Sequence, residues 1–232
     1  MSKSTQVQSL AEIQAQLKKQ TEALAGRIQS GGGNRIKLTK DKNFQLPDGS
    51  KNPGPMNVVI LDFVSQNQFF DRPWKEGDVT PPACFAIGDN PRTMVPDDTS
   101  PAKESEACTG CPNDEFGSKG AGKACANSRL LAIVEPGSDA SAPIMLLKVP
   151  AGSIKAFDAY VSTIKSQFET MPVGVETEIY FDPAKEFQAL LFGNPKPNEG
   201  LAVHYGRIQE AKDKLWAKPD VSQYEPPVKK KR

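Results

Sequence analysis

The chain has 232 residues with a formal net charge of +1, and 38% of its residues are hydrophobic. Its mean hydropathy is −0.49, and it has no run of about 18 apolar residues of the kind that crosses a bilayer. This composition argues against an integral membrane protein. The N-terminal residues also lack the apolar core of a signal peptide, so we expect a cytoplasmic protein with no membrane partner.

Charge is distributed unevenly along the chain. Residues 1–50 and 201–232 each carry an excess of four positive charges, whereas residues 51–102 and 130–200 carry an excess of three and four negative charges. Basic ends around an acidic middle suit a protein that holds an anionic polymer by its arms or by one face. Basic termini also occur on proteins that bind no nucleic acid, so the charge distribution alone identifies no partner.

The first predicted element is a helix over residues 9–29, which begins with the capping box Ser9-Leu10-Ala11-Glu12. The apolar residues that recur there at helical spacing are Leu10, Ile13, Leu17, Leu24 and Ile28. Three glycines follow, so residues 1–33 are predicted to form an N-terminal helix and a Gly-rich linker. We expect the helix to pack on the body as an appendage or, alternatively, to pair with a partner helix and form a homo-oligomer.

After these glycines the hydrophobic period becomes two, which is typical of strands. The predicted strands are 35–40, 56–64, 83–87, 130–134 and 144–149, with turns at 47–49 and 135–138. The second strand, MNVVILDFV, is apolar almost without alternation, so we expect part of it to be buried on both faces. Five short strands suggest a small β-barrel with the size and strand count of an oligonucleotide-binding (OB) barrel.

The C-terminal part is predicted to add helices to these strands. Apolar spacing predicts a helix over 154–168, a strand over 175–181 and a last helix over 207–217, whereas 187–192 is either a pairing strand or a short helix. Beyond these elements the chain is polar and ends in Lys-Lys-Lys-Arg, so we expect residues 219–232 to be a disordered basic tail.

All four cysteines, Cys84, Cys108, Cys111 and Cys125, lie within a window of 42 residues. A cytosolic chain of this length does not need disulfides, whereas four thiolates complete the tetrahedral shell of a structural zinc ion. Two residues separate the middle pair, which is the spacing of a metal knuckle, and Gly110 between them allows the backbone to curl. We therefore predict one structural Zn²⁺; an iron–sulfur cluster and free or redox-active thiols are the alternatives.

The sequence gives no good case for an enzyme. It contains no Walker-type phosphate loop, no dinucleotide fingerprint and no nucleophile elbow. The single histidine, His204, is expected to be an ordinary surface or core residue. A metal-dependent nuclease would require several acidic residues to converge on one site. The alternative is that these residues are ordinary strand residues that face solvent. The candidates are Asp62, Glu176, Glu178 and Asp182.

Single-stranded nucleic acid is bound by cations that follow the phosphates and by aromatic side chains that stack on the bases. Both kinds occur near the first predicted strand, in the loop after the second strand, and around the cysteines. The candidate cations are Arg35, Lys37, Lys40, Lys42, Lys119, Lys123 and Arg129. The candidate aromatics are Phe44, Phe69, Phe70 and Trp74. The alternative for each aromatic is burial in the core, and for each cation it is a solvated surface.

The sequence around the cysteines resembles a known family. The segments that carry the resemblance are CTGCPN at 108–113, FGS at 116–118, GKAC at 122–125, PPAC at 81–84 and SP at 100–101. Over about residues 80–135 they resemble bacteriophage-encoded single-stranded-DNA-binding proteins of the zinc-containing OB type. The resemblance implies a structural zinc on the four cysteines and a role in DNA replication, recombination or repair in the host cytoplasm. It fixes no DNA-contacting residue.

One departure from that family concerns the C-terminus. Many single-stranded-DNA-binding proteins end in an acidic tail that recruits partners, whereas this chain ends in Lys229-Lys230-Lys231-Arg232. Recruitment of replication or recombination proteins through the tail is therefore in doubt.

The expected fold is mainly β with flanking helices (α+β). A single OB-like domain over 34–218 carries a four-cysteine zinc loop over 84–129, with the N-terminal helix and C-terminal helices beside it. The expected function is binding of single-stranded DNA. The alternative is a zinc-stabilised protein-interaction or transcription adaptor without strong DNA binding.

Overall fold

The computed structural model describes residues 33–72 and 80–226. The predicted helix at 9–29, Trp74 and the basic end at 227–232 lie outside the described residues. The chain divides into two units at Gly33, and the elements below all belong to the second unit. No helix in the described part of the chain is long and apolar enough to cross a membrane.

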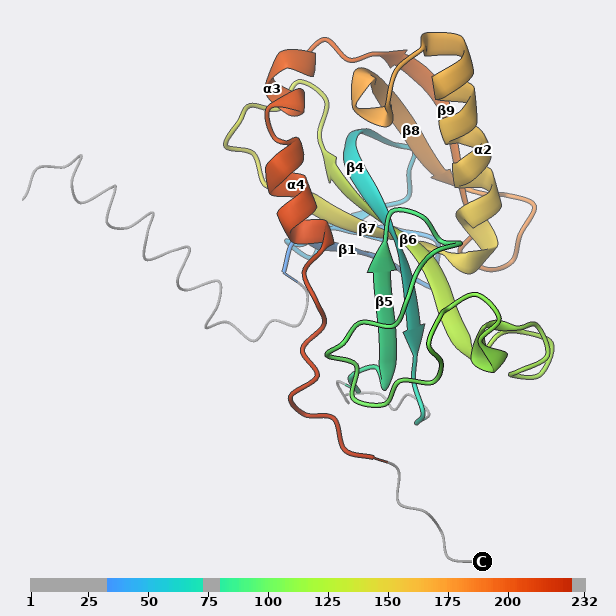
Figure 1. The fold of residues 1–232 in the computed structure, drawn as a ribbon. Helices are drawn as coiled ribbons and strands as arrows, with labels where there is room; N and C mark the ends of the chain where they lie inside the picture. The colour runs from blue at the N-terminus through green and yellow to red at the C-terminus, as the bar shows by residue number, and fades with distance from the viewer. Residues whose placement is uncertain (1–32, 73–79, 227–232) are drawn as a thin grey trace, which may run out of the picture. The chain divides into compact units, whose positions relative to one another are not determined.

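Nine strands form one sheet (Figure 1). They are β1 (Arg35–Leu38), β2 (Phe44–Gln45), β3 (Lys51–Asn52), β4 (Met56–Phe69), β5 (Cys84–Gly88), β6 (Cys125–Val134), β7 (Met145–Pro150), β8 (Val175–Phe181) and β9 (Leu190–Pro197). Eight strands follow the order β3-β2-β1-β7-β6-β4-β8-β9, and β5 pairs with β4. The β1–β7 pair is parallel, and the other pairs are antiparallel.

Strand β4 organises the sheet because it has different partners along its length. Its first half pairs with β8, where Val59 lies opposite Glu176, and its second half pairs with β5. Strand β6 pairs along its other side, and a register shift between Ile60 and Asp62 marks an irregularity near the change of partner. Such a bulge bends a strand and increases its twist.

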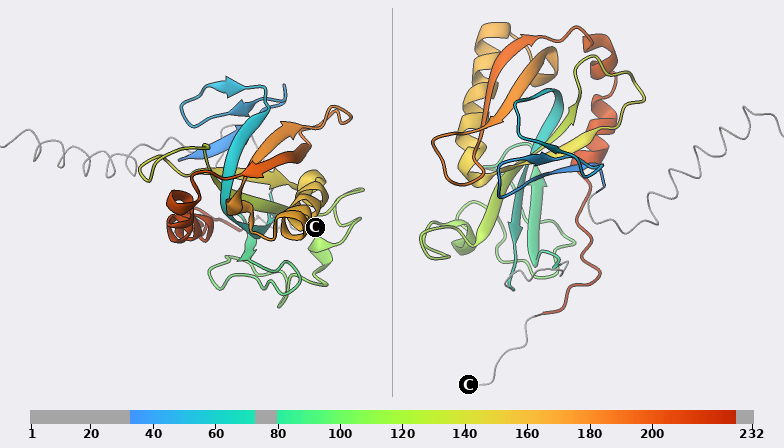
Figure 2. Two further views of the ribbon diagram at one scale, coloured as in Figure 1. Left: turned by 90° about the horizontal axis from the view of Figure 1, so that it is seen from above. Right: turned by 180° about the vertical axis from the view of Figure 1, so that it is seen from behind.

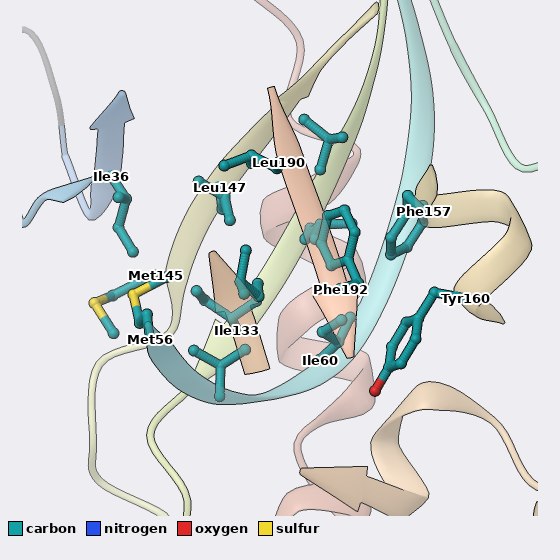
Figure 3. Packing of buried hydrophobic residues seen from close by; sticks show 14 of the residues in the cluster. Ile36, Met56, Ile60, Ile133, Met145, Leu147, Phe157, Tyr160, Leu190 and Phe192 are labelled. Atoms are coloured by element: carbon teal, nitrogen blue, oxygen red, sulfur yellow. The ribbon is translucent and has the colours of Figure 1, made fainter. Parts of the chain in front are cut away.

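Apolar side chains cover both faces of this sheet, as the unbroken run in β4 predicts. One cluster lies between the sheet and helix α2 (Ala151–Phe168), which contributes Phe157 (Figure 3). The other lies on the opposite face beneath helix α4 (Ile208–Leu215), which contributes Leu215. Alternate residues of 58–61 belong to different clusters. Burial of each such side chain stabilises the fold by about 1.5–3 kcal/mol.

The sheet curls strongly (Figure 2). Phe44 of β2 is fully buried, and its ring lies 4.6 Å, centroid to centroid, from the ring of Phe181 in β8. Lys42 reaches the same region, where its ammonium group donates to the backbone carbonyls of Asp182 and Lys185. The protein is therefore mainly β, with a curled sheet and few helices, as the sequence predicted at this level.

Most predicted elements are confirmed with shifted bounds. The six predicted strands correspond to β1, β4, β5, β6, β7 and β8, and the helix expected at 154–168 is α2. Residues 187–192 contribute to β9, which pairs with β8, so the strand alternative is the correct one. Helix α3 (Leu201–Tyr205) and the two-residue strands β2 and β3 were not predicted.

The segment after α4 corrects another expectation. Residues 219–226 were predicted to be a disordered tail, but they contact the body. The Tyr224 hydroxyl donates to the Asp71 carboxylate at 2.6 Å, and just before this segment Lys218 Nζ lies 2.9 Å from an oxygen of Asp97. The prediction of disorder rested on the polarity of this segment alone. Polarity does not reveal that these side chains have hydrogen-bond partners elsewhere in the chain.

Candidate nucleic-acid interface

The four cysteines line one cavity on the α2-side face of the sheet. Cys84 of β5 and Cys125 of β6 both lie opposite Phe69 of β4, and directly opposite residues of antiparallel strands point to the same face. The intervening segment brings Cys108 and Cys111 against this face. All four are free thiols that line one cavity of about 20 Å³, which has room for about one water-sized particle.

The knuckle between the middle two cysteines has the curled backbone that its glycine predicts. The Cys108 amide donates to the Met94 carbonyl at 3.0 Å, and the Cys111 amide donates to the Cys108 carbonyl at 3.2 Å. Gly110 has a φ of 79°, a left-handed conformation in which a side chain would be strained. The turn therefore directs both thiols of the knuckle to the same cavity.

Burial makes two of these thiols, Cys108 and Cys125, reluctant to ionise. It raises the pKa of Cys125 to about 12 and also raises the pKa of Cys108, with the Asp114 carboxylate and the other cysteines as further causes. Within residues 33–72 and 80–226, no three His, Cys, Asp or Glu side chains gather closely enough to form a metal-binding group. The predicted zinc site is thus a set of four sulfur donors around one cavity, which fits the donor chemistry of Zn²⁺, and not a formed coordination shell.

Residues 112–124, which we call the finger, project from the knuckle. The finger begins with a short 3₁₀ turn, η1 (Pro112–Asp114), and folds back where the amides of Gly117 and Lys119 donate to the Gly122 carbonyl at 3.0 and 3.2 Å. The Ser118 hydroxyl accepts from the Ala124 amide at 2.9 Å. Local hydrogen bonds therefore define a loop that has almost no apolar residues of its own.

A chain of polar contacts ties the finger to the sheet and to the cysteine cavity. The Asp114 carboxylate accepts from Lys123 Nζ at 3.2 Å and from the Asn127 side-chain amide at 2.8 Å. That amide also donates to Asn67 Oδ1 at 2.8 Å, and Asn67 lines the cysteine cavity together with Cys108. The finger is therefore coupled to the cavity by consecutive hydrogen bonds.

A groove of about 900 Å³ lies between the finger and the first turns of α2. The finger contributes Phe116 and Lys123 to its walls, and α2 contributes Ile154 and Lys155. Phe116 is 81% exposed, although it is a large apolar residue, and Lys123 Nζ lies 5.4 Å from its ring centroid. The groove thus combines an exposed aromatic ring with two cations.

Two of the predicted DNA contacts are wrong because the side chains are buried. Phe44 has no exposed surface and packs in the core, so no base can stack on it. Arg129 is only 8% exposed, and its guanidinium donates to both carboxylate oxygens of Asp158 at 3.2 and 2.9 Å. Arg129 therefore neutralises an acidic residue at the groove and fastens β6 to α2.

The remaining candidates lie in three separate places. Arg35, Lys37 and Lys40 are exposed on β1 and the turn after it, whereas the ammonium group of Lys42 binds carbonyl oxygens. Lys119 is exposed in the turn of the finger, near Lys123. Phe69 ends β4 and lines the cysteine cavity, and Phe70 after it is 38% exposed.

Sequence reasoning missed the aromatic residue of the groove and the helical cation opposite it. Phe116 stands out in the sequence because it is the single aromatic of a polar, glycine-rich stretch. Lys155 lies on the polar side of the predicted helix, but only the folded chain brings this side to the finger. Asn127, which hydrogen-bonds Asp114 of the finger, carries no signal of its own in the sequence.

The structure does not bring the nuclease candidates together as a metal-binding group within its described residues. Burial raises the pKa of Asp62, on which the charges of Lys212 and Asp89 also act, and Glu178 accepts a hydrogen bond from Asn194 at 2.9 Å. His204 is fully buried beside Asn198 and Ser138, which agrees with the core interpretation.

Comparisons of the chain with models of protein families, with curated proteins and with solved structures found no match. The resemblance to single-stranded-DNA-binding proteins therefore stays a prediction. The case for a function rests on the groove, the finger and the cysteine cavity.

Proposed function

We propose that the protein binds single-stranded DNA in the groove between the finger and α2, in DNA replication, recombination or repair. The observation that carries this proposal is the exposure of Phe116 beside Lys123. Leaving a phenylalanine in water forgoes about 1.5–3 kcal/mol of burial. Stacking of a base on such a ring stabilises a complex by about 1–3 kcal/mol and tolerates any sequence, because every base has a π face.

The cations around the groove suit a phosphate backbone. Lys123 of the finger and Lys155 of α2 line the groove, and Lys119 is exposed in the turn of the finger. Lys123 is paired with Asp114, whereas Lys119 and Lys155 take part in no ion pair among the described residues. The Asp158 carboxylate at the groove is paired with Arg129, and the Asp114 carboxylate is paired with Lys123. Because these acidic groups already have partners, they repel phosphates less than free carboxylates would.

We further propose that the four cysteines hold one structural Zn²⁺ and that the curled sheet is OB-like. The ion would be held by Cys84, Cys108, Cys111 and Cys125, and its role would be to fix the knuckle and the finger, without chemistry at the DNA. The donor set supports the zinc. The mainly β, strongly curled sheet supports the OB-like architecture.

The test is a fluorescence-anisotropy titration of labelled single-stranded and duplex oligonucleotides at two salt concentrations. We expect a strong preference for the single strand and about tenfold weaker binding by Phe116→Ala, from the loss of one stacked base. Phe168→Ala, which removes a partly exposed ring at the end of α2, is the matched control. Equal affinities of the two variants would contradict the assignment of the groove.

A different surface favours the adaptor function as the second candidate. Around α3, Met171, Leu201 and Tyr205 are 57%, 41% and 66% exposed and line an apolar groove of about 570 Å³. Exposed apolar patches of this kind commonly mark protein interfaces. If neither oligonucleotide binds, Tyr205→Glu becomes the variant with which to test a protein partner.

A further inference from the structure

Three cations lie on the face of the sheet opposite the groove. In the parallel pair of β1 and β7, Arg35 lies opposite Leu146, and Leu146 packs against the α4-side cluster. Lys37 and Lys148 each lie two residues further along their strands and therefore share that face. We call Arg35, Lys37 and Lys148 the outer cation cluster.

The outer cation cluster has no acidic partner within the described residues. None of its three members takes part in an ion pair there. Lys148 is half-buried, and its ammonium group donates to the neutral oxygen of Gln68 at 2.9 Å.

The electrostatic setting of Lys148 is unfavourable to its charge. Burial lowers the pKa of Lys148, and the nearby Arg35 guanidinium lowers it further. Neighbouring positive charges that are partly withdrawn from water destabilise one another unless an anion lies between them.

We propose that the outer cation cluster binds a phosphate group. The guanidinium of Arg35 offers a planar fork that matches two phosphate oxygens, and the lysines offer point charges. We assign this phosphate to the backbone of the bound single strand, an assignment that rests on the proposed function. A strand that reaches both sites has to pass around the end of the sheet where β6 begins and β7 ends, so short oligonucleotides fill only one of them.

The first test is the salt dependence of binding to a long and a short single-stranded oligonucleotide. For the long one, Lys148→Gln is expected to reduce the slope of log affinity against log salt by about 0.7, the value for one lost phosphate contact. Lys148→Arg keeps the charge and is expected to keep the slope. Lys165→Gln removes an exposed lysine of α2 and serves as the matched control.

The outcomes separate this inference from the proposed function. An unchanged slope for Lys148→Gln, while Phe116→Ala still weakens binding, would refute the backbone assignment and leave the function intact. A reduced slope with no effect of Phe116→Ala would keep the phosphate site and reject the groove. Thermal melting of each variant checks that the fold is retained.

A second test needs no DNA. Inorganic pyrophosphate is titrated into the protein at low salt and followed by ³¹P nuclear magnetic resonance. A saturable shift that Lys148→Gln abolishes and Lys165→Gln keeps supports the phosphate site, even if the chain binds no single strand. The same shift in wild type and Lys148→Gln would overturn it. Loss of pyrophosphate binding with unchanged DNA binding would assign the site to a free phosphate compound.

Discussion

Phe116 and Arg129 lie close together in the sequence, yet their side chains have opposite environments: one is 81% exposed and the other 8% exposed. Arg129 is buried because Asp158 on α2 takes both of its hydrogen bonds. Phe116 stays outside because the finger offers no apolar neighbours to cover it, and the Lys123 ammonium group lies over its ring. Arg129 is therefore a structural residue because the fold places Asp158 beside it, whereas Phe116 remains available for binding because no apolar side chain covers it.

The outer cation cluster leads to a prediction about stability. Replacing Lys148 with Met removes a half-buried charge from beside Arg35 while keeping the apolar stem. We expect the free energy of unfolding to rise by about 0.5–1 kcal/mol, because such charges often cost more than an apolar replacement. A thermal melt without DNA or phosphate should therefore give a melting temperature about 1–4 °C higher.

The same melt distinguishes a binding role from a structural one. Lys165→Met, at an exposed position of α2, controls for the general effect of exchanging a lysine for methionine. A lower melting temperature for Lys148→Met would show that Lys148 has a structural role, namely that its hydrogen bond to Gln68 stabilises the fold.

At the scale of elements, the finger and the knuckle differ from the rest of the protein. The sheet and α2 are held by two apolar clusters, whereas residues 108–125 rely on turns, polar contacts and the cysteine cavity. Such segments open locally at a lower free energy than a packed core. A metal ion bound by the four thiols would therefore stabilise residues 108–125 more than it stabilises the packed core.

Replacing Cys111 with Ser tests this difference between elements. We expect loss of the proposed zinc, measured by elemental analysis, and faster amide hydrogen exchange over residues 84–129, with exchange in the core strands little changed. Thr109→Ala removes a hydroxyl that donates to the Arg92 carbonyl at 2.8 Å in the same knuckle and should keep the zinc. Unchanged zinc content in Cys111→Ser would rule out the four-cysteine site.

Elements with a full hydrophobic period were predictable from sequence, and shorter ones were not. The run in β4 and the apolar stripe of α2 each contain enough residues to show a period. Strands β2 and β3 have two residues each and α3 has five, too few for any period. The same limit explains the error at Phe44, whose strand is too short to show which face is buried.

The candidate site was predictable where its chemistry is local and not where it depends on distant partners. Four cysteines with a Gly110 turn are visible in one window of sequence. The pairing of Arg129 with a residue 29 positions away, and the approach of Lys155 to the finger, arise only from folding. Sequence therefore located the cysteine cavity but assigned two core residues to the DNA surface.

At the scale of the whole molecule, the segment after α4 joins distant parts of the described chain. Lys218 pairs with Asp97, Tyr224 donates to Asp71, and Arg72 lies 3.9 Å from Glu225. These contacts connect the C-terminal segment to the end of β4 and to the segment after β5. These polar contacts hold the C-terminal segment against the body. Each exposed ion pair among them stabilises the fold by only about 0–1 kcal/mol.

Two truncations test whether this segment supports the fold. Deleting residues 226–232 is expected to leave the melting temperature unchanged and to weaken DNA binding somewhat, because it removes four cations. Deleting residues 218–232 is expected to lower the melting temperature as well, because it removes the contacts to Asp97 and Asp71. Equal melting temperatures for both truncations would show that these contacts contribute nothing measurable.

The contact between Tyr224 and Asp71 also predicts a dependence on pH. The hydroxyl donates to a carboxylate, which raises the pKa of Tyr224 to about 12, above the ordinary value of about 10. Because the folded pKa is the higher one, the contact contributes its full stability below about pH 10 and loses it as pH rises through about 12. The absorbance of phenolate, titrated in wild type and Tyr224→Phe, should differ by one group that ionises near pH 12. A difference curve centred near 10 would contradict this contact.

Hydrogen bonds run from Lys123 through Asp114 and Asn127 to Asn67, which lines the cysteine cavity, so binding in the groove and binding in the cavity are coupled. If a bound strand steadies Lys123, the same hydrogen bonds steady the thiols, and linkage requires the effect to run equally in both directions. The strand and the ion would then each raise the affinity of the protein for the other by the same factor. Competition with a chelator should therefore give a tighter metal affinity for the DNA-bound protein, and the metal-depleted protein should bind DNA more weakly.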